Sequence, residues 1–347
     1  MLGRGTIMKR TTIKDIANAV GVTPAVVSYV LNGKEHKVSG DTVQRVKNAI
    51  KEFNYIPNMN ARSLVNNKSK LIGVIIPQTE TSAQILLKNP FYSEIISGIE
   101  VRLRAGGYNM ILSGVDNDKS YLNTSVQRNL DGAIIMGIYQ EKFYDELKQA
   151  SIPIVLIDSY ITDDSFYRIG IDDELGGYMA TKYLIEHGHR DIALVTGSIK
   201  RDGVIEKRFL GYKRALNEMN IFYNPDYVFE GVVSHENGYH AGELISEKFK
   251  NITAVFASAD LIALGLMKSF AEKGIRIPED ISVMGFDNIS TLEYTYPPLT
   301  TVSQSIGLKG EMAANVLIEI IENKQKENPK ELVLPIEVVT RKTVKRL

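Results

Sequence analysis

Five charged residues, three carboxylates and two guanidinium groups, follow short apolar runs that read as buried strands. They are Asp158, Arg201, Arg208, Asp260 and Asp287. In open α/β sheets, ligands bind at the carboxyl ends of the strands. A hydroxyl of a polyhydroxylated ligand can donate to a carboxylate and accept from a guanidinium group. These residues therefore predict a small-molecule site, with Arg208 and Asp287 as its strongest candidates.

Two of the carboxylates also fit a purely structural role. An Asp that follows a strand often accepts a backbone N–H at the start of the next helix. Asp158 and Asp260 are as consistent with such a cap as with ligand binding. Arg201 stands in the loop 198–203, whereas Arg208 lies in the helical pattern that follows.

The motifs of the common enzyme classes are missing. The sequence has no G-x-G-x-x-G after a strand, no G-x-x-x-x-G-K-[ST], no G-x-S-x-G and no H-E-x-x-H. It contains no cysteine, which removes disulfides, thiolate metal sites and cysteine nucleophiles. His187 and His189 lack a third ligand, so a solvated loop is expected there rather than a metal site. We expect no catalytic residues, no cofactor and no metal, although an α/β enzyme stays an alternative because such sheets host many chemistries.

The elements that must position the charged residues are strands alternating with helices from Leu71 onward. The strand-like runs are 71–76, 109–113, 132–136 and 154–157, followed by 192–196, 254–257 and 282–285. Nearly continuous apolar strands separated by helices indicate parallel sheets covered on both faces. At 347 residues the chain can form two or more domains, and these runs predict two similar α/β lobes.

No apolar run approaches the roughly 20 residues of a membrane span. Residues 1–10 lack the apolar core of a secretory signal, so we expect a cytoplasmic protein. A sugar-binding protein with a fused helical module remains an alternative, but a secreted one would need a signal peptide and would have no use for a basic module.

The N-terminal part reads as three short helices with a tight turn. Thr12 and Asp15 form a capping-box pattern for the first helix, and Gly21 ends it. Thr23 and Pro24 start the second helix as N-cap and first residue. Ser39 caps the third. The expected core residues of this module are Val27, Val30 and Leu31, with Val43, Val46, Ile50 and Phe53.

Charge is segregated between the two ends of the chain. Residues 1–70 hold twelve Lys and Arg against four Asp and Glu, and the other 277 residues hold 29 against 37, although the whole chain has zero formal net charge. A basic helical module joined to an acidic domain is the electrostatic pattern of a protein that presents one end to nucleic acid. A three-helix module that binds another protein is the alternative.

The N-terminal motifs resemble those of the LacI/GalR family of bacterial transcription regulators. The resemblance rests on the runs T-I-K-D-I-A (12–17), G-V-T (21–23), V-S-Y-V-L-N (27–32), N-Y-I-P-N (54–58) and A-R-S-L (61–64). It implies a helix-turn-helix domain over 10–56, a hinge helix and linker over 57–70, and an effector-binding and dimerisation domain over 71–347.

The resemblance also implies roles in DNA binding. Base-reading positions fall on Pro24, Ala25 and Tyr29, and Leu64 matches the leucine that wedges between bases in the minor groove. Phosphate contacts are expected from Thr23, Ser28, Asn32 and Tyr55, and the DNA-binding set also includes Thr12 and Arg62. Pro24 and Ala25 cannot form bidentate hydrogen bonds, and Tyr29 stands where relatives often have Arg or His, so the operator sequence is not given by analogy. Tyr29 could also pack over its helix without touching a base.

For the large domain the resemblance implies a two-lobed fold of the periplasmic-binding-protein type with an effector in the cleft. Lobe 1 is expected over about 71–160 and 295–323, and lobe 2 over about 165–288 and 330–347. Crossings are expected near 160–168, 287–295 and 323–332, with a strand over 332–340. Phe91 and Tyr92 match aromatic ligand-contact positions, although both could be core residues at a helix start.

Together these features predict a ligand-responsive transcription regulator. We expect it to be a repressor of sugar-metabolism genes. We expect a homodimer on a palindromic double-stranded operator, because the chain ends at Leu347 without an apolar heptad tail. The effector is expected to be a sugar or sugar derivative; a purine corepressor is the alternative. Whether the effector releases or tightens DNA binding is left open.

Overall fold

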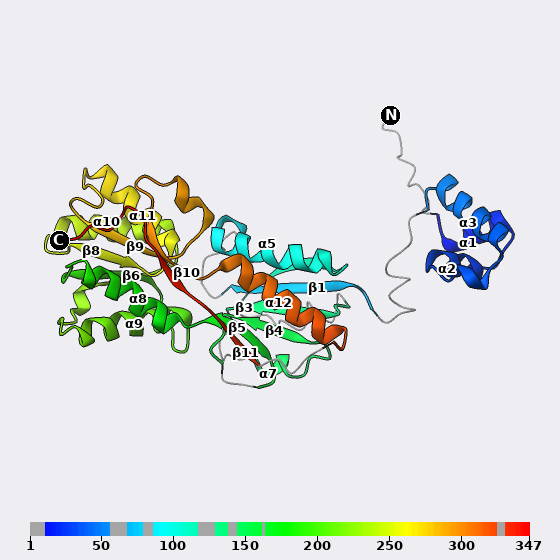
Figure 1. Ribbon diagram of the computed structural model, residues 1–347, viewed down its shortest axis with the longest axis horizontal. Helices are drawn as coiled ribbons and strands as arrows, with labels where there is room; N and C mark the ends of the chain where they lie inside the picture. Colours follow the sequence, from blue (N-terminus) through cyan, green and yellow to red (C-terminus); the bar gives the residue numbers. More distant parts are fainter. Residues whose placement is uncertain are drawn as a thin grey trace, which may run out of the picture. The chain divides into compact units, whose positions relative to one another are not determined.

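The computed structural model describes residues 11–55, 68–78, 86–116, 129–137, 144–161, 164–324 and 330–347. The chain divides into two compact units, Met1–Ser69 and Lys70–Leu347 (Figure 1). The predicted hinge helix, with Arg62 and Leu64, lies outside the described residues.

The first unit is a small three-helix module. Its helices are α1 (Ile13–Val20), α2 (Pro24–Leu31) and α3 (Gly40–Glu52), with a short 3-10 turn at η1 (Glu35–Lys37). The capping box is present: Asp15 donates its backbone N–H to the Thr12 hydroxyl and accepts the Thr12 backbone N–H. Gly21 ends α1 at φ 72°, a left-handed conformation that glycine adopts without strain.

The core of this module is close to the expected one. Ile16, Ala17, Val20, Val27, Val30, Val43, Val46 and Ala49 are buried, and Leu31 and Ile50 pack against them. Phe53 was expected in the core and this prediction is wrong, since it is 40% exposed. Phe53 follows the last turn of α3 as its C-cap, and Ala49, one turn earlier, is buried in its place.

The second unit begins with a six-stranded sheet, in the order β11-β5-β4-β3-β1-β2. Its strands are β1 (Leu71–Gln78), β2 (Asn109–Asp116), β3 (Gly132–Met136), β4 (Ile154–Ile157), β5 (Tyr167–Ile171) and β11 (Glu331–Leu334). Helices α5 (Pro90–Ala105), preceded by η2 (Leu86–Lys88), and α12 (Ile306–Ile321) pack together over one face. The other face buries a separate cluster with α7 (Tyr144–Leu147).

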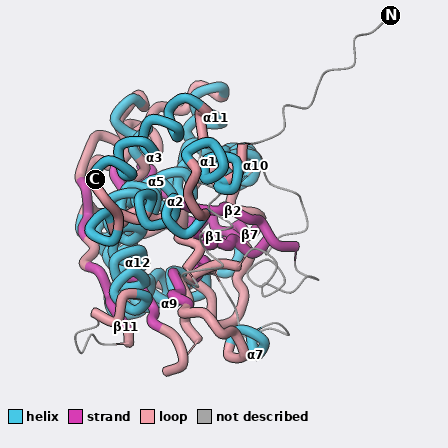
Figure 2. The backbone as a smooth tube through the Cα atoms, turned by 90° about the vertical axis from the view of Figure 1, so that its right-hand side faces the viewer, coloured by secondary structure: helices cyan, strands magenta, loops and turns pink. Residues whose placement is uncertain are grey.

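A second six-stranded sheet, in the order β12-β10-β9-β8-β6-β7, forms lobe 2. Its strands are β6 (Ile192–Gly197), β7 (Val228–Gly231), β8 (Ala254–Ala257), β9 (Ser282–Asp287), β10 (Thr300–Ser303) and β12 (Glu337–Val339). Helices α8 (Asp173–Glu186) and α9 (Val204–Glu218) lie on one side, and α10 (His235–Lys248) and α11 (Asp260–Glu272) on the other (Figure 1). Short 3-10 turns are η3 (Pro225–Tyr227) and η4 (Ser290–Tyr294). Figure 2 shows strands and helices of the chain in separate colours.

All described strand pairings are parallel except that of β10 with β12. The central strands of both sheets are buried on both faces, since β3, β4, β6, β8 and β9 are buried at every position. The predicted fold class, a helix-turn-helix module with a two-lobed α/β domain, is confirmed, and the seven predicted strands are present.

The crossings between the lobes lie elsewhere than expected. The chain leaves lobe 1 at Asp172, between β5 and α8, returns at Gln304 and Ser305, between β10 and α12, and leaves again at Pro335 and Ile336. The predicted crossings and lobe boundaries were wrong by several residues. The reason is that β5 contains Arg168 and β10 is mostly hydroxyl residues, so neither shows the apolar pattern of a buried strand.

The single strand expected over 332–340 is two strands in different lobes. β11 extends the first sheet beside β5, and β12 pairs antiparallel with β10 in the second. Pro335 falls between them. Proline has no N–H to donate to a sheet ladder, which favours the break at this point.

Candidate functional site

The outward face of α2 carries the candidate DNA contacts of the first unit. Thr23, Pro24 and Ala25 are exposed at the start of the helix. Thr23 is the N-cap, yet its hydroxyl makes no capping hydrogen bond, so it is free to meet a phosphate beside the N–H groups of the first turn. Asn32, at the other end, donates to the Ser28 carbonyl over 2.9 Å.

Tyr29 is half-buried on this face, and the ammonium of Lys37 lies 5.4 Å from its ring centroid. This distance is within the range of a cation–π contact, which attracts the lysine to the face of the ring. Of the remaining candidates, Thr12 uses its hydroxyl in the capping box, and Tyr55 packs against the helical core.

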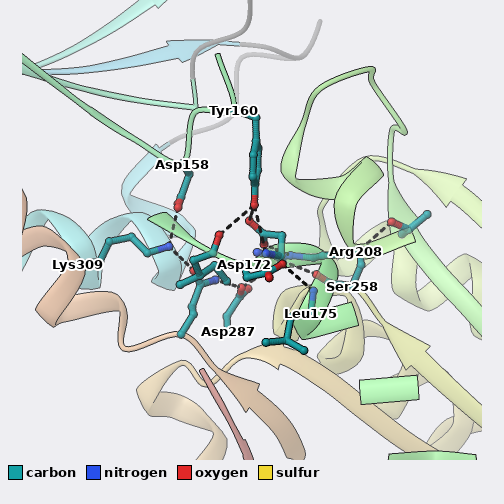
Figure 3. Close-up of polar contacts among 12 residues, drawn as sticks. Asp158, Tyr160, Asp172, Leu175, Arg208, Ser258, Asp287 and Lys309 are labelled. Atoms are coloured by element: carbon teal, nitrogen blue, oxygen red, sulfur yellow. Dashed lines mark hydrogen bonds and ion pairs between the residues drawn. The ribbon is translucent and has the colours of Figure 1, made fainter. Parts of the chain in front are cut away.

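In the second unit, Arg208 is the centre of a buried ion-pair group within lobe 2. Its Nε donates to Asp173 Oδ1 over 2.8 Å, and its Nη1 donates to the Ser258 carbonyl over 2.7 Å and to Asp287 Oδ1 over 3.4 Å. The guanidinium also stacks 3.7 Å from the Phe286 ring centroid. Figure 3 shows Arg208 lying close to Ser258 and Asp287.

The same group continues into lobe 1 through an amide. Gln304, at the β10 to α12 crossing, donates its Nε2 to Asp287 Oδ1 over 2.5 Å and accepts from Lys309 Nζ. Lys309 is completely buried, and its ammonium lies 2.7 Å from Asp158 Oδ1 (Figure 3). Charged side chains are rarely buried unless they are paired, and this lysine is.

Tyr160 closes the group at the β5 to α8 crossing. Its hydroxyl lies 2.5 Å from Asp173 Oδ2 and 3.1 Å from the Ile171 carbonyl, and it accepts the backbone N–H of Asp173. Tyr160 follows β4 in lobe 1, whereas Asp173 begins α8 in lobe 2. Polar side chains thus bridge two of the three crossings.

Burial governs the titration of these groups. It raises the pKa of Asp287 to about 6, against the opposing effects of Arg208, Gln304 and Lys309. Burial likewise raises the pKa of Asp173 despite the nearby Arg208, and the pKa of the Tyr160 phenol. For Arg208, burial disfavours the charge, but the carboxylates of Asp173 and Asp287 outweigh it and raise its pKa.

Backbone strain gathers at the same place. Asp158, Asp287 and Ser305 have φ values of 52°, 124° and 50°. Residues other than glycine adopt positive φ at a cost, and such strain persists only where the surroundings enforce it. Its presence at two strand ends and one crossing marks these positions as a candidate ligand site.

The structure thus brings Asp158, Arg208 and Asp287 into one hydrogen-bonded group, and it places the other candidates differently. Asp260 is fully buried; it accepts from the Thr301 hydroxyl over 2.6 Å and from the Ile289 backbone N–H over 3.0 Å. Burial raises its pKa well above the ordinary range, and the adjacent Asp287 adds to this. It supports the turn after β9 and does not form the expected cap of α11, whose N-cap is Ala259.

Asp158 is not a helix cap either, since its carboxylate binds Lys309. Arg201 is 91% exposed at its side chain and pairs only with its neighbour Asp202 in the described contacts. Phe91 and Tyr92 begin α5 and are half-buried against the core, with ring centroids 5.4 Å apart. The Phe91 ring centroid lies 5.9 Å from the Lys309 ammonium, close to the ion-pair group.

Four members of the group escaped sequence reasoning: Asp173, Tyr160, Gln304 and Lys309. Asp173 and Tyr160 flank β5, and Gln304 and Lys309 follow β10, the two strands whose polar residues hid them. A lysine at the fourth position of α12, in the run I-G-L-K-G, was the one available signal for a buried cation.

His189 also departs from expectation. It is buried, with Nδ1 2.9 Å from the Thr253 hydroxyl and Nε2 3.2 Å from the Lys345 carbonyl, so the solvated-loop prediction is wrong for this residue. Burial lowers its pKa. Within the described ranges, no group of three His, Cys, Asp or Glu side chains could hold a metal ion. None of the helices in those ranges is long and apolar enough to cross a membrane.

Comparison with known proteins gives matches to both units. Residues 12–58 match the model of the bacterial regulatory proteins of the lacI family, and residues 181–344 match that of a periplasmic binding protein-like domain. The HTH-type transcriptional repressor PurR of Histophilus somni (strain 129Pt) is 37% identical over 342 residues, covering 97% of this chain and 99% of the relative. The ribose operon repressor of Haemophilus influenzae is 34% identical, covering 96% and 98%.

Solved structures extend the likeness to the whole chain. A lac repressor dimer bound to operator and the anti-inducer ONPF superposes with a TM-score of 0.83 at 28% identity, covering 97% of this chain and 100% of that one. A lacI-family regulator from Enterococcus faecium with bound ribose has a TM-score of 0.70 at 31% identity, covering 80% and 99%.

Proposed function

The chain belongs to the lacI family of bacterial regulatory proteins and is a ligand-responsive repressor, not an enzyme; we propose that it binds a palindromic operator as a homodimer and takes a sugar or sugar derivative as its effector. The observation that carries operator binding is the face of α2. Thr23 to Ala25 are exposed there, and Tyr29 is held beside Lys37.

In this proposal α2 lies in the major groove. Pro24 and Ala25 offer only apolar contacts to base edges, so Tyr29 supplies the directional hydrogen bond. Thr23, Ser28 and Asn32 contact phosphates, with Thr12 and Tyr55 nearby. Phosphate contacts fix the position of the helix but do not select a sequence.

The hinge is proposed from the sequence alone. Arg62 contacts the DNA backbone, and Leu64 enters the minor groove at the centre of the operator. A wedge between bases unstacks a step and bends the duplex, so pyrimidine–purine steps should be favoured at the centre. The dimer is supported by the likeness to a lac repressor dimer on its operator.

The effector is proposed to contact Arg208, Asp287 and Asp158, with Phe91 and Tyr92 at the lobe 1 side and Arg201 and Asp260 as weaker members. The buried carboxylates and guanidinium group suit hydroxyl groups, which both donate and accept. The likeness to a ribose operon repressor and to a ribose-bound regulator supports a sugar.

A purine is the second candidate, favoured by the likeness to PurR repressors over 97% of the chain. A purine base also offers donors and acceptors to Arg208 and Asp287, and Phe91 could stack on its ring. A sugar and a purine would change operator affinity in opposite directions only if one acts as an inducer and the other as a corepressor. The direction of the change therefore does not identify the ligand by itself.

The test begins with selection of bound duplexes from a random double-stranded DNA library. The enriched operator is then titrated with D-ribose, cellobiose, hypoxanthine and guanine, while operator affinity is followed. An enriched palindrome whose affinity changes with a sugar supports the proposal. A change with hypoxanthine or guanine alone replaces the sugar by a purine, and enrichment of a non-palindromic site contradicts dimeric binding.

A further inference from the structure

The ion-pair group meets α12 at a completely buried lysine. We propose that effector binding at Asp287 displaces Gln304 and Lys309, and that helix α12 transmits this displacement to Lys70, the first residue of the second unit. This relay rests on the proposed function in one respect only: it presumes that an effector binds at Asp287.

The first step of the relay is the amide of Gln304. Gln304 is buried, and its two ends face partners of opposite kind: Nε2 donates to the Asp287 carboxylate, and Oε1 accepts from the Lys309 ammonium. Reversing the amide would place N–H against an ammonium and oxygen against a carboxylate, so only one orientation is compatible. An effector that takes hydrogen bonds at Asp287 therefore competes directly with Gln304.

The second step is the buried charge of Lys309. Its ammonium has two described partners, Gln304 and Asp158. If Gln304 turns away, the completely buried ammonium loses one acceptor, and an unmet buried donor is costly. The lysine must then move toward Asp158, its remaining partner, and α12 carries it.

The third step is the packing of α12 on α5. A Cβ at Gly98 would lie 2.2 Å from the Gly307 carbonyl oxygen, and one at Gly310 would lie 2.3 Å from the Ile95 carbonyl oxygen. The two backbones thus touch without intervening side chains. Such packing leaves little room for bending, so a displacement at Lys309 moves the helix as a body.

The last step is at the far end of α12. The helix has 16 residues, which makes it roughly 24 Å long. Leu317 and Ile321 reach to within 3.0 and 3.1 Å of a Cβ placed at Gly132. Next to Gly132, the Asp131 carboxylate accepts the backbone N–H of Lys70 over 3.0 Å. Glu322, just after the helix, lies 4.0 Å from the Lys70 ammonium.

These contacts join the ion-pair group to the residue at which the chain enters the second unit. Asn109 of β2 also donates its N–H to the Lys70 carbonyl over 2.8 Å, so the position of Lys70 is fixed by three elements. A spatial path alone does not establish coupling, and the variants below test it directly.

The decisive variant is Gln304→Met in the full chain. Methionine keeps nearly the same volume but removes both amide hydrogen bonds, and Lys309 keeps Asp158 as its partner. Gln149→Met is the matched control, because it makes the same change at an exposed residue beyond α7. If Gln304→Met fails to fold, Lys309→Met combined with Asp158→Asn interrupts the relay while removing both charges of the pair together.

The first readout needs no ligand. Hydrogen–deuterium exchange is measured at the backbone amides of Lys70 and Asn109. The relay predicts that protection falls by about fivefold or more in Gln304→Met and is unchanged in Gln149→Met. Equal protection in the wild type and Gln304→Met overturns the relay, whatever the protein binds.

The second readout uses D-ribose and hypoxanthine as probes, each at saturation. In the wild type the active probe should change the operator dissociation constant by about 5- to 150-fold, the usual range of such coupling. In Gln304→Met the change should fall below about twofold. Full retention of the change overturns the relay. A wild type that responds to no probe contradicts the proposed effector, and the exchange measurement then decides the relay alone.

Discussion

Arg208 Nε donates to Asp173 Oδ1 over 2.8 Å, and both side chains are buried, with exposed fractions of 7% and 1%. Asp173 opens α8 and Arg208 lies within α9, so the pair joins two neighbouring helices of lobe 2. It also sets the position of the guanidinium group that we propose for effector binding. Removing either partner leaves the other charge buried.

Asp173→Ala is therefore expected to lower the free energy of unfolding by about 3–5 kcal/mol, the usual cost of removing one partner of a buried ion pair. Asp172→Ala is the matched control. Asp172 caps α8 by accepting the Leu175 N–H over 2.8 Å, and losing a cap costs about 1 kcal/mol. Urea denaturation measures both. Equal losses in the two variants would show that the buried pair is not the larger contribution.

The pH dependence of stability should reveal Asp287. Burial raises the pKa of Asp287 to about 6 in the folded chain, above its ordinary value of 3.8. The folded state therefore binds this proton more tightly than the unfolded state. The stability that the proton contributes is fully present below about pH 4 and is lost as the pH rises through about 6.

Asp287→Asn removes this titration. The stability of the wild type relative to Asp287→Asn should fall between about pH 4 and pH 6 and stay level above that range. Burial also raises the pKa of Asp173 and Asp260, and both carboxyls remain in the variant. Because Asp287 adds to the raised pKa of Asp260, the difference between the two proteins includes the response of Asp260 to the loss of this neighbour. A difference that rises with pH would reverse the sign and contradict the buried-carboxylate argument.

Gly177 permits the close approach of α8 and α9. A Cβ at this position would lie 2.1 Å from the Arg208 carbonyl oxygen, a backbone atom that cannot move aside cheaply. Gly177→Ala should lower the free energy of unfolding by about 1–3 kcal/mol, as overpacking does. Gly307→Ala, in α12, has open space around its Cβ and should cause no loss. Thermal unfolding of both variants distinguishes packing from helix propensity.

Tyr29 should contribute to operator recognition through its hydroxyl. Tyr29→Phe keeps the ring beside Lys37 but removes the hydrogen bond, and Tyr29→Ala removes both. If the hydroxyl reads a base, each variant should lose about 1–3 kcal/mol of operator binding and relax the preference at one base pair. Fluorescence anisotropy on base-substituted operators measures this. Unchanged selectivity in Tyr29→Phe would mean that the ring packs without reading a base.

Leu64→Ala tests the proposed wedge. Operator affinity should fall, and the loss should be smaller on operators with a stiffer central step, because less of their binding depends on the kink. Effector affinity should be unchanged. Leu244→Ala, at a half-exposed leucine of α10, is the control for a leucine truncation elsewhere. Equal operator affinity in Leu64→Ala and the wild type removes the wedge from the mechanism.

The sequence predicts the parts of this fold that follow from apolar patterns. β3, β4 and β8 are short apolar runs, and the structure has them at the expected residues. Arg208 and Asp287 were predicted to share one site because charged groups after such strands meet at one edge of a sheet, and they do lie together.

Residues that are polar and buried are harder to predict. In β10, Thr300 and Thr301 are fully buried, but their hydroxyls are hydrogen-bonded to the Arg341 N–H and to Asp260. Lys309 is buried because Asp158, 151 positions earlier in the chain, neutralises it. The partners of these threonines and of Lys309 lie far away in the sequence. The polar strand and the buried cation therefore cannot be predicted from the residues around them.

The split of residues 331–339 between β11 and β12 constrains how the protein can be made. β11 completes the edge of the first sheet, and β12 with the buried Thr343, which accepts the Thr300 N–H, completes the second. Neither sheet can therefore be completed before this one segment has been synthesised. An emerging chain therefore exposes two unfinished sheet edges until β11, β12 and Thr343 have been synthesised, a stage at which unpaired strands are prone to aggregate.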